Sequence, residues 1–153
     1  LTVSHLDRLV LARCGFNHSV DYRSAMCFGT ARLVDDADEK RIALDRMIDR
    51  YYPGRAATLR TATAQEIKAT AVISMVIEEA SAKVRGKGVG DDPEDLDLAV
   101  WAGVIPIRTV IGAAEISPDV PAGVDLPADL AAFRPGRSLD EIFSETQRVY
   151  EGE

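Results

Sequence analysis

Histidine and cysteine are both scarce in this 153-residue chain, which contains two residues of each type. Cys14 and Cys27 are too few for the disulfide framework of a small secreted domain, and they do not form a CxxC motif. The spacing of His5 and His18 from these cysteines is not that of a zinc site, so we predict no metal site. Such a low number of cysteines is typical of a reducing compartment, and we expect a cytoplasmic protein.

Positive charge is also in short supply, because 18 Lys and Arg residues stand against 25 Asp and Glu residues and the net charge is −7. This acidic balance disfavours nucleic-acid binding, which is driven by counterion release on neutralising phosphates. The longest apolar run, residues 71–77, is interrupted by Ser74 and is far below the roughly 20 residues that span a membrane. We therefore expect neither nucleic acid nor a membrane as a partner.

Apolar residues are present in the normal amount for a folded domain, with 46 % hydrophobic and 28 % charged residues. Segments of β-strand character are predicted at residues 1–4, 9–13, 22–34, 70–85 and 104–111. The 22–34 segment places small residues, including Cys27 and Gly29, on one face, where another backbone or a flat ligand can approach closely. The first half of the 70–85 segment is apolar on both faces, which predicts a central strand.

Helix start signals occur at four places in the sequence, one of which, Asp92-Pro93, begins a short helical segment toward Trp101. Asp36 with Glu39 begins a helix that ends before residues 53–54, and Thr63 with Glu66 begins a short second helix. The apolar stripe of the first helix consists of Leu44, Met47, Ile48 and Tyr51. Ser138 begins a last amphipathic helix. Strands predominate, so the predicted fold class is mainly β within the α+β class, a β-barrel with peripheral helices.

A dense polar cluster at residues 17–24 lies at the start of the 22–34 strand and includes Asn17, His18, Tyr22, Arg23 and Ser24. Loops at the ends of rigid strands often carry function. Arg23 and Ser24 can offer a fork of donors and a hydroxyl to a phosphate or to ring carbonyls. His18 is a candidate proton donor because histidine is the side-chain type in this cluster that most often serves as a general acid. The alternative is a hairpin whose polar side chains make turn hydrogen bonds.

No catalytic residues can be assigned from motifs. No serine lies in a Gly-x-Ser-x-Gly elbow. Residues 85–90, RGKGVG, are rich in glycine but lack the GK[ST] ending of a phosphate-binding P-loop, and the alternative is a flexible turn.

Three stretches resemble one known family. They are HLDRLVLARCGFNHSVDYRSAMCFGTARLVDD at residues 5–36, IEEASAKVR at 77–85 and VWAGVIPIR at 100–108. In this order they are similar to the pyridoxamine 5′-phosphate oxidase-related flavin-binding proteins, and more narrowly to the branch that includes nitroimidazole-resistance proteins. The resemblance implies a split β-barrel in residues 1–116, with residues 117–153 as a tail and helix packing on it. It also implies a homodimer that binds FMN at its interface.

The resemblance also implies roles for particular residues. Arg23 and Ser24 stand where the oxidases have an Arg-Gln pair at the flavin, so Ser24 replaces the glutamine. Lys83 and Arg85, two apart on a strand and therefore on one face, are candidates to donate to the flavin ring. Trp101 is expected either to cover the ring or to pack in the core. Asn17, His18 and Tyr22 complete the predicted cofactor site.

Two departures from the family pattern limit what is expected of the chain. No Arg-x-His pair follows Arg108, so pyridoxamine phosphate itself is not the expected substrate. The family's first strands and phosphate-binding segment are missing, so we expect the chain to hold only part of the barrel. The leading hypothesis is an FMN-dependent oxidoreductase acting on a small molecule, with nitro-group reduction as a candidate reaction. The alternatives are a non-catalytic flavin- or haem-binding module and a structural fragment that dimerises without a ligand.

Overall fold

The computed structural model describes residues 1–152 and divides into two compact units. The first, which we call the sheet unit, contains Leu1–Ala31 and Met75–Arg108. The second, which we call the helical unit, contains Arg32–Ser74 and the segment from Thr109 onward. In the described part of the chain, no helix combines the length and the apolar character needed to cross a bilayer.

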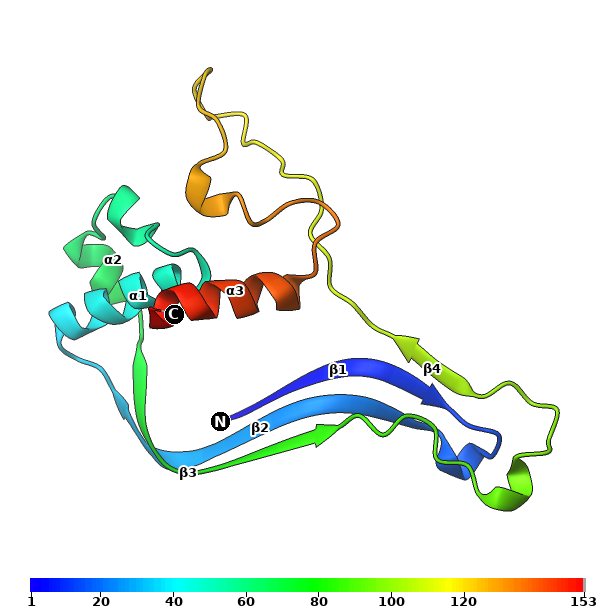
Figure 1. Ribbon diagram of the computed structural model, residues 1–153. Coiled ribbons are helices and arrows are strands. Elements are labelled where there is room, and N and C mark those ends of the chain that lie inside the picture. Colours follow the sequence, from blue (N-terminus) through cyan, green and yellow to red (C-terminus); the bar gives the residue numbers. More distant parts are fainter. Residues whose placement is uncertain (153) are drawn as a thin grey trace. The chain divides into compact units, whose positions relative to one another are not determined.

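Four strands form one sheet in the order β3-β2-β1-β4 (Figure 1). These strands are β1 (Thr2–Leu11), β2 (Ser19–Leu33), β3 (Ile73–Arg85) and β4 (Gly103–Pro106). β1 is antiparallel to both of its neighbours, β2 and β4. The connections that follow β1 and β3 therefore lie at the end of the sheet where β4 pairs.

β1 is one continuous strand, although the sequence predicts two strands separated by residues 5–8. The pairing with β2 runs from Thr2 opposite Met26 to Val10 opposite Ser19, with an irregularity between Leu6 and Arg8. A β-bulge of this kind accommodates one extra residue without ending the strand. The polar residues remain in the sheet because their side chains find ionic partners on β2.

The two edge strands differ from their predictions. β3 pairs with β2 alone in the described part of the chain, so its apolar faces, predicted to be central, are exposed at Val76 and Ile77. β4 is shorter than the predicted 104–111 strand and ends at Pro106, which has no N–H to donate to a ladder. Farther along, Val110 forms only an isolated bridge with Ser138.

Gly29 permits a close approach between β2 and β3, as the small-residue face of the sequence predicts. A Cβ atom added at Gly29 would lie 1.8 Å from the carbonyl oxygen of Val76. No side chain fits at that distance, so glycine is the residue that this crossing requires.

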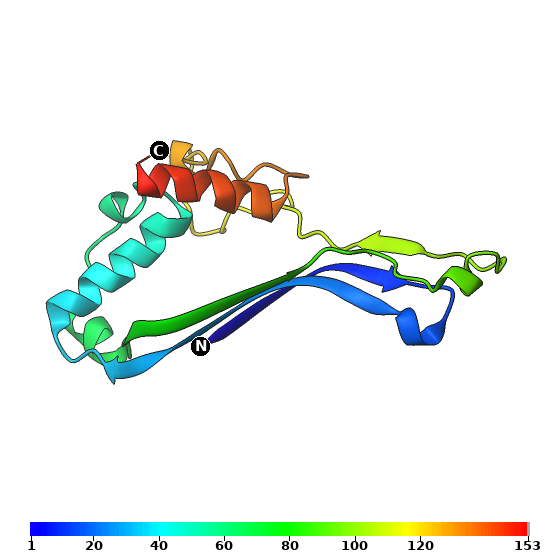
Figure 2. The same cartoon turned by 60° about the horizontal axis from the view of Figure 1, so that its bottom comes forward.

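The helical unit is built from α1 (Ala37–Tyr51), α2 (Ala64–Ala69) and α3 (Leu139–Glu151), and α1 packs against α3 (Figure 2). The ring centroids of Tyr51 and Phe143 are 5.1 Å apart at this contact. The buried residues of the unit are Val34, Ile67, Ile142 and Thr146. The predicted apolar stripe of α1 contacts α3 through Tyr51, but no residue of α1 is fully buried.

The helix starts predicted at Asp36, Thr63 and Ser138 are found, and side-chain hydrogen bonds explain the first two, whereas Ser138 makes no side-chain cap bond at the start of α3. The Asp36 carboxylate accepts from the backbone N–H groups of Asp38 and Glu39 at 3.0 and 2.8 Å. Thr63 and Glu66 form a complete capping box.

Candidate functional site

The sheet unit buries the carboxylate of Asp21, a residue that is 1 % exposed. Arg85 Nη1 donates to Asp21 Oδ1, and Arg8 Nη2 lies 2.7 Å from Asp21 Oδ2. A buried charge needs such partners, because an unpaired one costs several kcal/mol. The cluster joins β1, β2 and β3 and carries one more positive than negative charge.

The same arginines hold the glycine-rich stretch that the sequence leaves open as a flexible turn. Arg8 Nη2 donates to the Gly86 carbonyl oxygen at 3.1 Å, and Arg85 Nη2 donates to that of Gly88 at 3.5 Å. Gly88 has φ of +73°, in the left-handed region that favours glycine. The turn is therefore anchored to the sheet. Arg85, a predicted cofactor residue, is engaged with Asp21.

A second ion pair fixes the turn between β1 and β2. The Asp91 carboxylate accepts from the Arg13 backbone N–H at 2.8 Å and from Arg13 Nη1 at 2.7 Å. Burial raises the pKa of Asp91, but the two hydrogen bonds from Arg13 outweigh it and hold this pKa below its ordinary value. Asn17 Nδ2 also donates to Asp92 Oδ2 at 3.3 Å. Asn17 therefore acts in this structure as a tether.

His18 follows this turn and is exposed. Its Nδ1 atom lies 3.0 Å from the carbonyl oxygen of Cys14. Phe16, two residues earlier, is 92 % exposed. A backbone hydrogen bond from Asn17 N–H to the Cys14 carbonyl oxygen, at 3.1 Å, closes this turn, and His18 is exposed.

Tyr22 and Arg23 are consecutive on β2 and therefore point to opposite faces of the sheet. Arg23 makes a forked ion pair with Asp7, with Nη2 to Oδ1 at 2.7 Å and Nε to Oδ2 at 3.0 Å. The hydrogen bonds from Arg23 hold the pKa of Asp7 below its ordinary value. On the other side, Lys83 Nζ lies 5.6 Å from the centroid of the Tyr22 ring. Lys83 thus contacts Tyr22, whereas Arg85 contacts Asp21, the preceding residue of β2.

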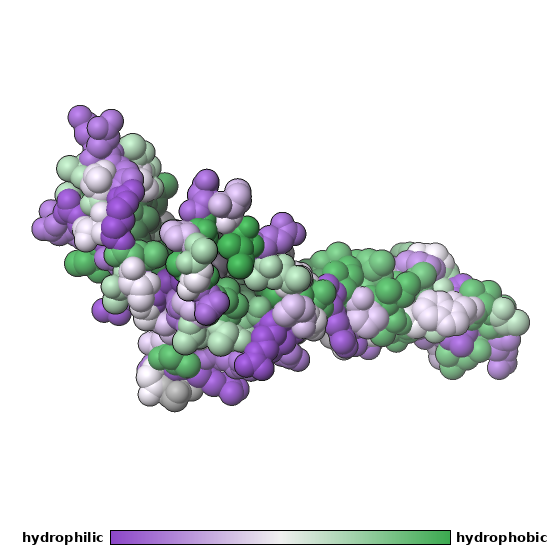
Figure 3. All heavy atoms as spheres, turned by 90° about the horizontal axis from the view of Figure 1, so that it is seen from above, coloured by the Kyte–Doolittle hydropathy of each residue, from purple (hydrophilic) through white to green (hydrophobic). Residues whose placement is uncertain are grey.

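One face of the sheet carries exposed apolar side chains; we call it the open face. Leu9 lies opposite both Val20 and Ile105, and Leu6 lies opposite Tyr22. The side chains of Leu6, Leu9, Val20 and Ile105 are 36–47 % exposed. Hydrophobic surface is visible over the end of the sheet where β1 and β4 pair (Figure 3). A contiguous exposed apolar face of this kind marks a binding surface.

Polar groups border the open face at its Tyr22 end. Ser24 lies two residues after Tyr22 on β2 and therefore shares its face, opposite Ser4. Lys83 approaches the Tyr22 ring from β3. Three of the predicted cofactor residues are thus brought together beside the apolar row.

Trp101 is 65 % exposed, so the core position that the sequence leaves open is not the one observed. Its ring lies over Gly103, where an added Cβ would be 2.8 Å from Trp101 Cζ2. Gly103 pairs with Leu11 at the end of β1, which places the indole near the turn that precedes His18.

Sequence reasoning did not single out Arg8, Asp21 or Asp91 as members of the site. The available signal was the two-residue period of β2, which puts Asp21 on the same face as Arg23. No local sequence pattern pairs Arg85 with Asp21, because the two residues are 64 positions apart in the chain.

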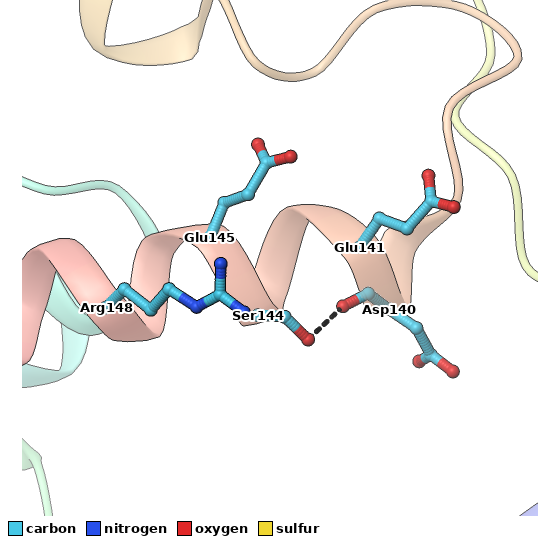
Figure 4. Close-up of a pocket in the computed structure, with 5 residues that line it drawn as sticks. All are labelled: Asp140, Glu141, Ser144, Glu145 and Arg148. Carbon is cyan, nitrogen blue, oxygen red and sulfur yellow. Dashed lines mark hydrogen bonds between the residues drawn. The ribbon is translucent and has the colours of Figure 1, made fainter.

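The hollows of the helical unit carry little chemistry. One, of about 320 Å³, runs along α3 and is lined by Asp140, Glu141, Ser144, Glu145 and Arg148 (Figure 4). The lining side chains belong to a single helix surface, where Ser144 Oγ donates to the Asp140 carbonyl oxygen at 2.8 Å. Within residues 1–152, no group of three or more His, Cys, Asp or Glu side chains is placed to hold a metal ion.

Comparison with known proteins assigns the family. The family described as pyridoxamine 5′-phosphate oxidase matches residues 1–84. The flavocytochrome Anf3 from Azotobacter vinelandii is 44 % identical with a TM-score of 0.80; the match covers 88 % of this chain and 63 % of that one. The FAD and Heme binding protein from Mycobacterium smegmatis is 38 % identical with a TM-score of 0.77; the match covers 88 % of this chain and 66 % of that one. No curated protein matches the chain.

The chain therefore belongs to the pyridoxamine 5′-phosphate oxidase family of flavin-binding proteins. Its four-stranded antiparallel sheet and three helices match the split-barrel fold, which confirms the predicted fold class. The chain spans a little under two thirds of the length of the two similar structures. The narrower nitroimidazole-resistance branch, the absent first strands, the division at residue 116 and the cytoplasmic location stay predictions.

Proposed function

We propose that the open face binds a flavin and that the protein is a flavin-dependent oxidoreductase acting on a small molecule. The observation that carries this proposal is the placement of Tyr22, Ser24 and Lys83 at the edge of an exposed apolar row. An isoalloxazine ring is a flat apolar surface with polar edges, so it needs this combination of groups. The residues present therefore fit the cofactor of the family.

Each group on the open face has a distinct role in this proposal. Leu6 and Leu9 supply apolar surface for the ring, and the Ser24 hydroxyl hydrogen-bonds to a ring edge. The Lys83 ammonium stabilises negative charge at the N1–O2 edge, since a cation favours the anionic form of a neighbouring group. A bound flavin supplies the redox chemistry, while these residues bind and orient it. The Arg23 guanidinium is paired with Asp7, so it would have to leave that ion pair to donate to the flavin. Its contact with the flavin stays a prediction.

The flavin that we propose is FAD. FMN is implied by the sequence resemblance, but one similar structure is that of an FAD- and haem-binding protein and the other is that of a flavocytochrome. FAD and FMN share the ring and its ribityl phosphate, so the open face serves both. We propose haem as a second cofactor on the same ground.

A second copy of this chain is the proposed cover of the open face. Apolar residues on this face are 36–47 % exposed, and burying them against a partner would be favourable, because it removes apolar surface from water. A homodimer buries this face twice and encloses the cofactor between two sheets. The prediction of a homodimer with the cofactor at its interface is thus retained as a proposal.

The test begins with the visible spectrum of the purified 153-residue chain. We expect flavin absorbance, release of FAD on heating, and loss of the flavin bands when NAD(P)H is added without oxygen. Release of FMN would correct the cofactor, and bound flavin that NAD(P)H leaves oxidised would favour a non-catalytic module. A colourless chain that neither FAD nor FMN titrates would refute the proposal.

The substrate is tested on the same preparation. Consumption of a nitroaromatic compound, matched to NAD(P)H oxidised, would support the nitro-group reduction predicted from the resemblance. Pyridoxamine phosphate serves as the negative control, because no Arg-x-His pair follows Arg108.

A further inference from the structure

The imidazole ring of His18 is oriented by the backbone. Its Nδ1 atom lies 3.0 Å from the Cys14 carbonyl oxygen, and a carbonyl oxygen can only accept a hydrogen bond. Nδ1 is therefore the donor in this contact, and in the neutral ring with this tautomer Nε2 carries the free lone pair. Within residues 1–152, no hydrogen bond engages Nε2.

This is the arrangement of a histidine that ligates a metal. A ligating histidine donates its other ring N–H to a carbonyl or carboxylate, which fixes the tautomer and raises the basicity of the ligating nitrogen. Resting on the proposal that the chain binds haem, we infer that Nε2 of His18 would be a ligand of the haem iron.

The turn that carries His18 is held on both sides. The Cys14 carbonyl oxygen also accepts from the Asn17 backbone N–H at 3.1 Å, so the acceptor is part of the turn itself. Arg13 and Asn17 are bonded to Asp91 and Asp92. A ligand on such a tethered turn is positioned before the metal arrives.

The surroundings of His18 suit a large apolar macrocycle. Phe16 is 92 % exposed, and Trp101 is 65 % exposed at the neighbouring end of β1 and β4. The segment that leads to Trp101 also exposes Leu96, Leu98 and Val100. Apolar side chains on the turn that carries His18 and on the segment before β4 are thus exposed.

His5 is the other histidine, and it lacks these features. It lies opposite Arg23 in the β1–β2 register, beside the Arg23–Asp7 ion pair. In the part of the chain that the structure describes, no hydrogen bond orients its ring. His5 is therefore the matched control for His18.

The test is a hemin titration of the full chain with its flavin bound, read by the Soret band and by electron paramagnetic resonance. We expect His18→Ala to raise the hemin dissociation constant at least about tenfold and to abolish the wild-type iron spectrum. We expect His5→Ala to behave as wild type. Added imidazole should restore the spectrum in His18→Gly, as a replacement ligand. Unchanged flavin content in each variant reports that the fold is intact.

The outcomes separate this inference from the proposed function. A His18→Ala chain with the wild-type Soret band and resonance spectrum would overturn the inference while haem binding stands. If His5→Ala loses haem and His18→Ala keeps it, His5 and not His18 is the iron ligand. A wild-type chain that takes up no hemin would overturn both the inference and the haem part of the proposed function, while leaving the flavin part intact.

Discussion

Asp21→Asn removes the one negative charge that Arg8 and Arg85 share inside the sheet unit. The substitution keeps the side-chain shape but leaves two guanidinium groups without a counter-ion. Breaking a buried ion pair costs about 3–5 kcal/mol. The arginine side chains remain 35 % and 26 % exposed, so water recovers part of this loss, and we expect a destabilisation of about 3 kcal/mol, at the low end of that range.

The assay is urea unfolding of the full chain, with tryptophan fluorescence as the probe, because Trp101 lies in the sheet unit. We expect a lower midpoint with an unchanged slope. Asp7→Asn is the control, since its ion pair with Arg23 is partly exposed, and we expect its unfolding midpoint to change much less than that of Asp21→Asn. If the two variants unfold at the same urea concentration, the buried cluster does not stabilise the sheet and the reasoning fails.

Three further substitutions test the packing and the helix starts. Gly29→Ala places a Cβ 1.8 Å from a β3 carbonyl oxygen and should cost about 1–3 kcal/mol in urea unfolding, whereas Gly15→Ala, with open space around it, should be near neutral. Ile142→Ala at a fully buried position should cost about 2–5 kcal/mol by the same measure, and Ile116→Ala at an exposed one almost nothing. Hydrogen bonds from Arg60 lower the pKa of Glu66 from 4.5 to about 2. Its stabilising contribution is therefore full above pH 4.5 and lost as the pH falls toward 2, so the stability gap between wild type and Glu66→Gln should close over that range.

Local hydrogen bonding explains which parts of the fold are predictable from the sequence. Asp36 and Thr63 bind backbone groups within three residues of themselves, so their chemistry alone marks the helix starts. Gly29 is likewise marked by its place in a run of small residues. The family motifs at residues 5–36 carry the fold class, because they specify the strands and the turn together.

Longer-range features are not contained in a local pattern. The apolar run of β3 indicates a strand covered on both faces, but the pattern does not say whether the cover comes from this chain or from another, and β3 lies at an edge. The sequence makes Arg85 a candidate donor to the flavin ring, whereas folding places it on Asp21. The spacing of Cys14 and His18, four residues apart in a turn, is a signal that sequence reasoning did not use.

The central claim is that the open face binds the flavin between two copies of the chain, and Leu9→Lys tests it most directly. Leu9 is in the middle of the apolar row, opposite Val20 and Ile105, so a charge there opposes both burial and ring binding. Molar mass by light scattering and flavin content by absorbance are measured together on this variant and on Ile116→Lys, an exposed control in the helical unit. We predict a flavin-free monomer for Leu9→Lys and a flavin-loaded dimer for Ile116→Lys. A Leu9→Lys chain that remains dimeric with its full flavin content would contradict the account.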